Sequence, residues 1–68
     1  MKAIYLVQNN YEGFCEGYTN TYEQAYTVIE KILRDRLGWD EEDIQVEMNA
    51  ISEGCGEFFD IVETYEII

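Results

Sequence analysis

Apolar and β-branched residues open the chain, and their pattern predicts a strand. Residues 2–8 are apolar on both faces at their centre, which is typical of a strand with neighbours on both sides. Asn9 and Asn10 then provide turn chemistry, since Asn tolerates a positive φ. Residues 13–18 follow either as a second strand paired with the first or as an ordered loop, because two glycines weaken the strand pattern.

The clearest periodicity predicts a helix over residues 21–37. Apolar residues recur there every three or four positions and form one stripe. Asn20 and Thr21 offer N-caps, and Gly38 is the residue expected just past the C-terminus. The stripe consists of Tyr22, Ala25, Tyr26, Ile29, Ile32, Leu33 and Leu37.

After an acidic turn at residues 40–43 the pattern changes to a period of two. This alternation predicts a half-buried strand over residues 44–50. A last strand is expected over residues 57–67, joined to the previous one through a turn at residues 52–56 as an antiparallel hairpin. In the first of these strands the apolar positions are Ile44, Val46, Met48 and Ala50, and the polar ones are Gln45, Glu47 and Asn49.

These elements predict an α+β fold. It consists of a single helix packed on a small three- to four-stranded antiparallel sheet, in the order β(β)αββ. The length of 68 residues allows one domain, spanning residues 1–68. A hydrophobic content of 47% is too high for intrinsic disorder.

Charge is distributed unevenly along the chain. The sequence has 15 Asp and Glu against 4 Lys and Arg, with no His, for a formal net charge of −11. All four cations lie in residues 1–36, whereas residues 37–68 hold ten acidic residues and no cation. Because the ten are interleaved with apolar residues, the charge belongs to folded structure rather than to a tail. They are Asp40, Glu41, Glu42, Asp43, Glu47, Glu53, Glu57, Asp60, Glu63 and Glu66.

This charge argues against several classes of function. We expect no direct binding to DNA or RNA, because too few cations are present to replace the counterions on phosphate. Binding to an anionic membrane surface is disfavoured for the same reason. No apolar run approaches the roughly 18 residues that cross a bilayer, and no signal peptide is visible. The expectation is therefore a soluble, cytoplasmic protein.

Catalytic and metal chemistry have few residues to draw on. Without His the chain lacks a ready base near neutral pH, and the glutamates beside Cys15 and Cys55 do not stabilise a thiolate. Two thiols without His also leave a zinc shell half empty. We expect no enzyme activity, no cofactor and no metal site. Whether the two cysteines are reduced or joined in a disulfide stays open.

Aromatic residues are more numerous than a core of this size can hold. Tyr11, Phe14, Tyr18 and Trp39 fall in loops or at element ends, where an exposed ring often serves an interface. Carboxylates steer a basic partner and pair with its Lys and Arg, while aromatic rings anchor the desolvated centre. A purely solubilising surface is the alternative. The candidate binding residues are Trp39 and the ten acidic residues of the second half.

The opening strand at residues 1–7, the single helix at residues 21–37 and the terminal acidic strand pair carry a resemblance. The chain resembles small acidic α+β proteins encoded by bacteriophages and other mobile elements, among which anti-CRISPR proteins and nucleic-acid mimics are the best-known functional class. The resemblance implies a stoichiometric inhibitor in the cytosol of a host cell. It would occupy the nucleic-acid groove of a basic host protein, such as a CRISPR effector or another nuclease, with carboxylates in place of phosphates.

A second hypothesis is a non-catalytic structural or assembly protein. Its apolar last strand would form a sheet edge that pairs with the same strand of another copy, giving a homodimer.

Overall fold

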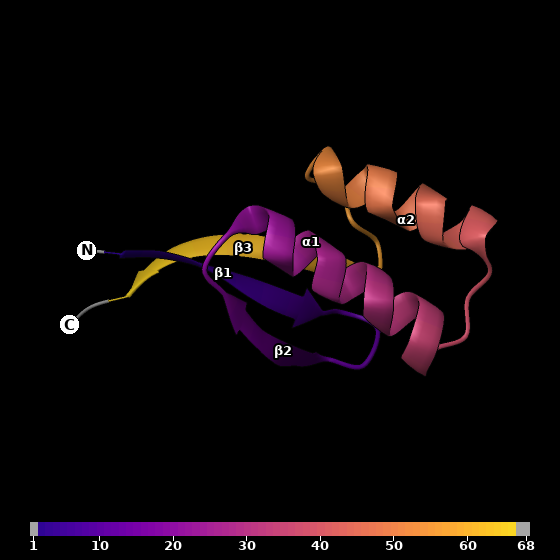
Figure 1. The fold of residues 1–68 in the computed structure, drawn as a ribbon, viewed down its shortest axis with the longest axis horizontal. Coiled ribbons are helices and arrows are strands. Elements are labelled where there is room, and N and C mark those ends of the chain that lie inside the picture. The colour runs from indigo at the N-terminus through magenta and orange to yellow at the C-terminus, as the bar shows by residue number, and fades with distance from the viewer. Residues whose placement is uncertain (1, 67–68) are drawn as a thin grey trace.

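Three strands form one antiparallel sheet with β1 at its centre (Figure 1). The computed structural model describes residues 2–66. Strand β1 (Lys2–Asn9) pairs with β2 (Phe14–Thr19) on one side and with β3 (Phe59–Glu66) on the other. The central position predicted for residues 2–8 is confirmed, and residues 13–18 mostly form a strand rather than a loop. The part of the predicted last strand at residue 67 lies outside the described residues.

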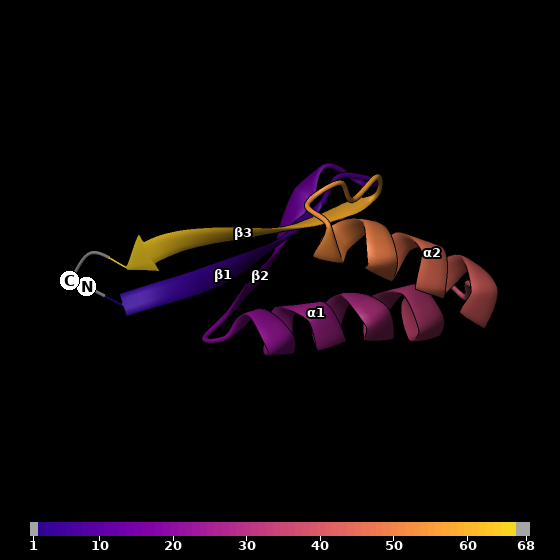
Figure 2. The ribbon, with the colours of Figure 1, turned by 90° about the horizontal axis from the view of Figure 1, so that it is seen from above.

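Helices lie against one face of this sheet (Figure 2). Helix α1 (Tyr22–Lys31) begins after Thr21, whose hydroxyl accepts a hydrogen bond of 3.1 Å from the backbone N–H of Gln24. A π-helical segment, η1 (Ile32–Arg36), continues it. Gly38 follows with a φ of +70°, the left-handed conformation that ends a helix at little cost for glycine. The helix predicted from the apolar stripe is confirmed.

A second helix takes the place of one predicted strand. Residues 44–50 lie within α2 (Glu41–Ser52), so the strand predicted there is wrong. The helix starts at Asp40, whose side chain accepts a 3.0 Å hydrogen bond from the backbone N–H of Asp43. It ends in a Schellman motif, in which Gly54 adopts a φ of +79°.

The burial pattern of α2 explains the error. Ile44, Met48 and Ile51 are buried at helical spacing. Val46, which the alternating pattern placed with them, is 67% exposed. Ile44 and Met48 fit both a period of two and a period of 3.6. The choice therefore depends on residues at the two ends of the segment.

The predicted hairpin between the last two strands is also wrong. Strand β3 pairs with β1 instead, in a register that runs from Lys2 opposite Glu66 to Asn9 opposite Phe59. The observed order is β-β-α-α-β. The α+β class and the small antiparallel sheet are confirmed, with two helices where the prediction had one.

The hydrophobic core lies between the two helices and the face of the sheet that they cover. Each large apolar side chain buried there contributes about 1.5–3 kcal/mol of transfer free energy. Strands β1 and β3 extend beyond the helices, which makes the molecule 40 Å long and 21 Å wide (Figure 1). Among residues 2–66 no helix is long and apolar enough to cross a membrane. The core consists of Val7, Ala25, Ile29, Leu33, Ile44, Met48, Ile51 and Phe59.

Gly56 is expected to tolerate no side chain. A Cβ atom added there would lie 1.9 Å from the carbonyl oxygen of Phe59, so the backbone would have to move. We expect Gly56→Ala to lower the free energy of unfolding by about 3 kcal/mol. The control is Gly54→Ala, where a Cβ would meet open space and only the positive φ costs about 1 kcal/mol. Urea unfolding followed by tryptophan fluorescence measures both; equal losses would contradict the steric argument.

Candidate functional site

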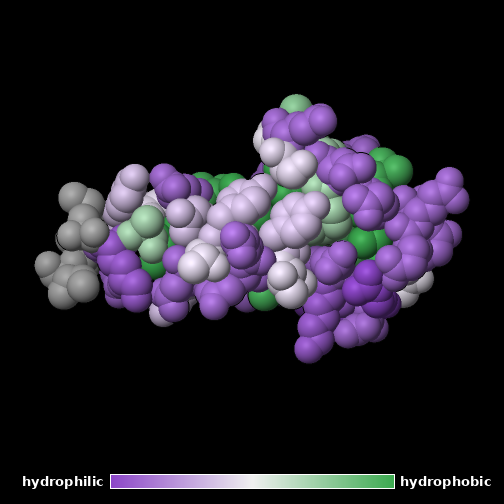
Figure 3. Space-filling view, turned by 45° about the horizontal axis from the view of Figure 1, so that its top comes forward, coloured by the Kyte–Doolittle hydropathy of each residue, from purple (hydrophilic) through white to green (hydrophobic). Residues whose placement is uncertain are grey.

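The acidic residues 40–43 surround the N-terminus of α2. Asp40 caps the helix, and the three acids of its first turn are stabilised by the partial positive charge of the helix N-terminus. All four side chains are exposed. Figure 3 shows hydrophilic residues gathered at this end of the molecule, where α1 connects to α2. These four acids therefore form a solvent-exposed group whose position is determined by the start of α2.

The other predicted acids are spread along the molecule. Glu53 follows α2 and Glu57 precedes β3, while Asp60, Glu63 and Glu66 lie on β3. Asp60 is half-buried and the other four are exposed. The start of α2 and the end of β3 lie at opposite ends of the long axis (Figure 1). The structure thus displays acids along its length rather than bringing all ten into one cluster.

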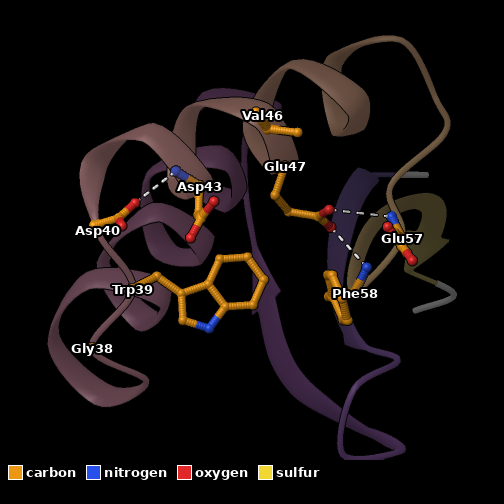
Figure 4. Close-up of a pocket in the computed structure, with 8 residues that line it drawn as sticks. All are labelled: Gly38, Trp39, Asp40, Asp43, Val46, Glu47, Glu57 and Phe58. Atoms are coloured by element: carbon orange, nitrogen blue, oxygen red, sulfur yellow. Dashed lines mark hydrogen bonds between the residues drawn. The ribbon is translucent and has the colours of Figure 1, made fainter.

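Glu47 is the exception, because it lies inside the molecule. Glu47 is only 4% exposed. Its carboxylate accepts hydrogen bonds from the backbone N–H groups of Phe58 at 2.8 Å and Glu57 at 3.4 Å (Figure 4). The backbone N–H group of Phe59 donates a third hydrogen bond to it at 3.0 Å. These charge-assisted bonds compensate for the loss of hydration. Glu47 is therefore a structural residue and is not available to a partner.

Two arginines neutralise part of the acidic surface from within the chain. Arg34 forms a bidentate pair with Glu41, at 2.6 and 2.9 Å, and lies 3.8 Å from Glu30. The hydrogen bonds from Arg34 lower the pKa of Glu41 below its ordinary value. Both partners are well exposed, so the pair adds little to stability. Its effect is that Glu41 has less charge to offer a partner.

Arg36 makes the second set of ion pairs, with Glu12 and Glu16 of the β1–β2 hairpin. Hydrogen bonds from Arg36 and Asn9 lower the pKa of Glu16, against the opposing effect of burial. Asn9 is 1% exposed and donates to both glutamates. This network fastens the hairpin to the end of the first helix, and it uses acids of the first half only.

An open hollow lies between the start of α2 and the segment that leads into β3. Its volume is about 560 Å³. Trp39 and Asp43 stand on one side, with Glu47, Glu57 and Phe58 on the other (Figure 4). The rings of Trp39 and Phe58 meet edge to face, with centroids 5.2 Å apart. Gly38, Asp40 and Val46 complete the lining.

The aromatic residues predicted to serve an interface divide into two kinds. Tyr11, Phe14 and Tyr18 are 58%, 46% and 63% exposed. Trp39 is half-buried and packs against the core. The ring of Tyr11 contacts Phe58 edge to face at 5.7 Å, so Phe58 joins Tyr11 to the wall of the hollow. Phe58 was not among the predicted site residues, because a lone aromatic before a strand carries no signal of its position.

Cys15 and Cys55 are both free and exposed, so they do not form a disulfide. Within the described part of the chain, no three Cys, Asp or Glu side chains are grouped so that they could hold a metal ion.

No protein-family model matches the chain, and comparisons with curated proteins and with solved structures give no match.

Removal of the Glu47 carboxylate should destabilise the fold. Glu47→Ala leaves backbone N–H groups at the start of β3 without their acceptor, and we expect a loss of about 3 kcal/mol in the free energy of unfolding. Glu47→Gln, which keeps one oxygen acceptor, should lose less. Chemical denaturation measures both, with the exposed Glu42→Ala as control at a loss within about 1 kcal/mol. A Glu47→Ala variant as stable as the control would show that the carboxylate does not hold these segments together.

Proposed function

We propose that this chain is a small inhibitor that binds a basic, nucleic-acid-binding protein through its carboxylates, in place of nucleic acid. The supporting observation is the surplus of exposed carboxylate in the second half. The ion pairs found in residues 2–66 engage Arg34 and Arg36 with only one acid of that half, Glu41. The acids left for a partner are Asp40, Glu42, Asp43, Glu53, Glu57, Asp60, Glu63 and Glu66.

The rigidity of the carrier supports the same proposal. Most of these acids stand on a helix or a strand, so their positions are fixed before a partner arrives and little ordering entropy is lost on binding. A surface of one charge also accelerates the approach of an oppositely charged protein and weakens with salt. Such an inhibitor acts stoichiometrically and needs no catalytic residue or cofactor.

The class of target follows from the resemblance to phage and mobile-element proteins. A CRISPR effector or another nuclease carries a Lys- and Arg-rich groove for nucleic acid, which carboxylates on a rigid sheet and helix would occupy. Action on such a target takes place in the cytosol of the host cell.

The proposal predicts binding that is sensitive to salt and competed by nucleic acid. The immobilised chain is expected to capture a basic protein from a lysate of the source cell at 50 mM salt. Added DNA or RNA should release the captured protein, because nucleic acid replaces the carboxylates in its basic groove. Salt at about 0.5 M should also release it, because salt screens the charges. Mass spectrometry identifies what is caught. Capture that is indifferent to both ionic strength and nucleic acid would overturn the proposal.

A pair of charge-matched variants sharpens this experiment. Glu42→Gln with Asp43→Asn removes two charges from the first turn of α2. Glu23→Gln with Asp35→Asn removes two from the first half. The first variant should weaken capture by about three- to tenfold, and the second should leave it nearly unchanged. Equal effects would show that net charge, rather than the surface of the second half, determines binding.

A second candidate function is self-association through the last strand. The observation in its favour is that β3 lies at an edge of the sheet, with β1 as its only partner among the described residues. Against it, Asp60, Glu63 and Glu66 place charge on this edge strand, which is how proteins discourage edge pairing. Sedimentation at micromolar concentration distinguishes the two functions. We expect a monomer, whereas a stable dimer that Val62→Lys dissolves would favour assembly.

A further inference from the structure

The hollow between α2 and the segment before β3 combines two features that arise independently. The first is an apolar wall, since Trp39 packs against the core and Phe58 closes on it edge to face. The second is a negative rim, formed by side chains at the start of α2 and by Glu57. A volume of about 560 Å³ lies in the range of sites that hold small ligands or single side chains.

The geometry of α2 explains how the rim is built. Asp43, Val46 and Glu47 are separated by three and four positions, so they share one face of the helix and that face lines the hollow. Glu47 turns its carboxylate to the backbone of residues 57–59, which draws Glu57 to the opposite side (Figure 4). Asp43 and Glu57, both exposed, therefore lie on opposite sides of the hollow, with Asp43 on the same side as Trp39 (Figure 4).

The chemistry of this lining selects a cation with a flat, partly apolar surface. The face of an indole ring attracts a cation more strongly than the face of any other side chain. Carboxylates repel an anion, and an apolar ligand would leave them poorly hydrated. Residues 37–68 supply no Lys or Arg of their own to fill the position. The carboxylates alone would be an ordinary solvated helix start; the aromatic wall beside them is what favours an organic cation.

We infer that the hollow binds the guanidinium group of an arginine side chain presented by the basic partner. Guanidinium is planar, stacks on an aromatic face and donates hydrogen bonds in a fork that fits carboxylates. In the bound state it stacks on Trp39 and donates to Asp43 and Glu57. Lysine, a compact and strongly hydrated point charge, uses the same rim but gains less from the ring. This inference rests on the proposed function, and it names the anchor point within that surface.

The chain contains a single tryptophan, so Trp39 reports directly on the hollow. The probes are two peptides of equal length and charge, nona-arginine and nona-lysine. Titrated into the folded protein at low salt, nona-arginine is expected to change the Trp39 fluorescence and to bind about three- to thirtyfold more tightly than nona-lysine. Affinity is measured independently by calorimetry.

Variants separate the hollow from the rest of the acidic surface. Asp43→Asn with Glu57→Gln should abolish most of the preference for arginine. Glu63→Gln with Glu66→Gln removes the same charge from β3, away from the hollow, and should weaken both peptides alike while keeping the preference. Trp39→Leu should remove the preference as well. Because Trp39 packs against the core, the fold of the Trp39→Leu variant is checked by circular dichroism. The variant with Asp43→Asn and Glu57→Gln provides the same test without a change in the core.

The outcomes distinguish this inference from the proposed function. If both peptides bind in a salt-dependent manner with equal affinity and without a change in Trp39 fluorescence, the arginine pocket is wrong and the acidic surface stands. If a basic protein is captured but the Asp43 and Glu57 variant keeps full preference for arginine, the pocket is likewise overturned. If neither peptide binds at low salt, both the pocket and the proposed function fail.

Discussion

The carboxylate of Glu47 connects two parts of the molecule that no strand pairing joins. Helix α2 makes no hydrogen-bonded ladder with the sheet, yet its middle holds the backbone of residues 57–59 at the point where β3 begins. The carbonyl of Phe58 in turn accepts hydrogen bonds from the N–H groups of Asn10 and Tyr11. The placement of α2, the entry of β3 and the turn after β1 therefore depend on one another. A charge buried in this way is stable only while every one of its hydrogen bonds is kept, so small displacements of the segment are costly.

The sequence predicted the parts of the fold whose signals agree with one another. The first strand is predicted correctly because its apolar, β-branched run and the Asn turn after it indicate the same element. For the helix after Thr21, the apolar stripe, the N-cap and the terminating glycine likewise agree. Residues 44–50 were assigned wrongly because Ile44 and Met48 satisfy two periods at once. The deciding residue, Ile51, lies beyond the alternating run, and Asp40 fits the predicted acidic turn as well as it fits a helix N-cap. The position of β3 beside β1 could not be predicted, since strand partners depend on packing between distant segments.

The candidate site shows a similar division. Exposure of the acids at the start of α2 follows from sequence, because a run of charge at a helix start has no reason to be buried. Glu47 could not be separated from them by composition. Its burial follows only from the helical conformation of residues 44–51, which places Glu47 between Ile44 and Met48 on the inner face. Likewise, nothing in the sequence indicates that Phe58 meets Trp39, because the two approach each other only through the fold.

The pairing of β1 with β3 has a consequence for how the protein folds. The central strand pairs with β3 across most of the described chain, because β2 and both helices lie between the two strands in the sequence. Contacts between such distant segments raise the contact order, which slows folding because a long loop must close before the pairing is rewarded. While β3 is unpaired, one edge of β1 has no partner strand, even where β1 and β2 are already paired. The net charge of −11 makes copies of the chain repel one another, which protects this unpaired edge against pairing between molecules.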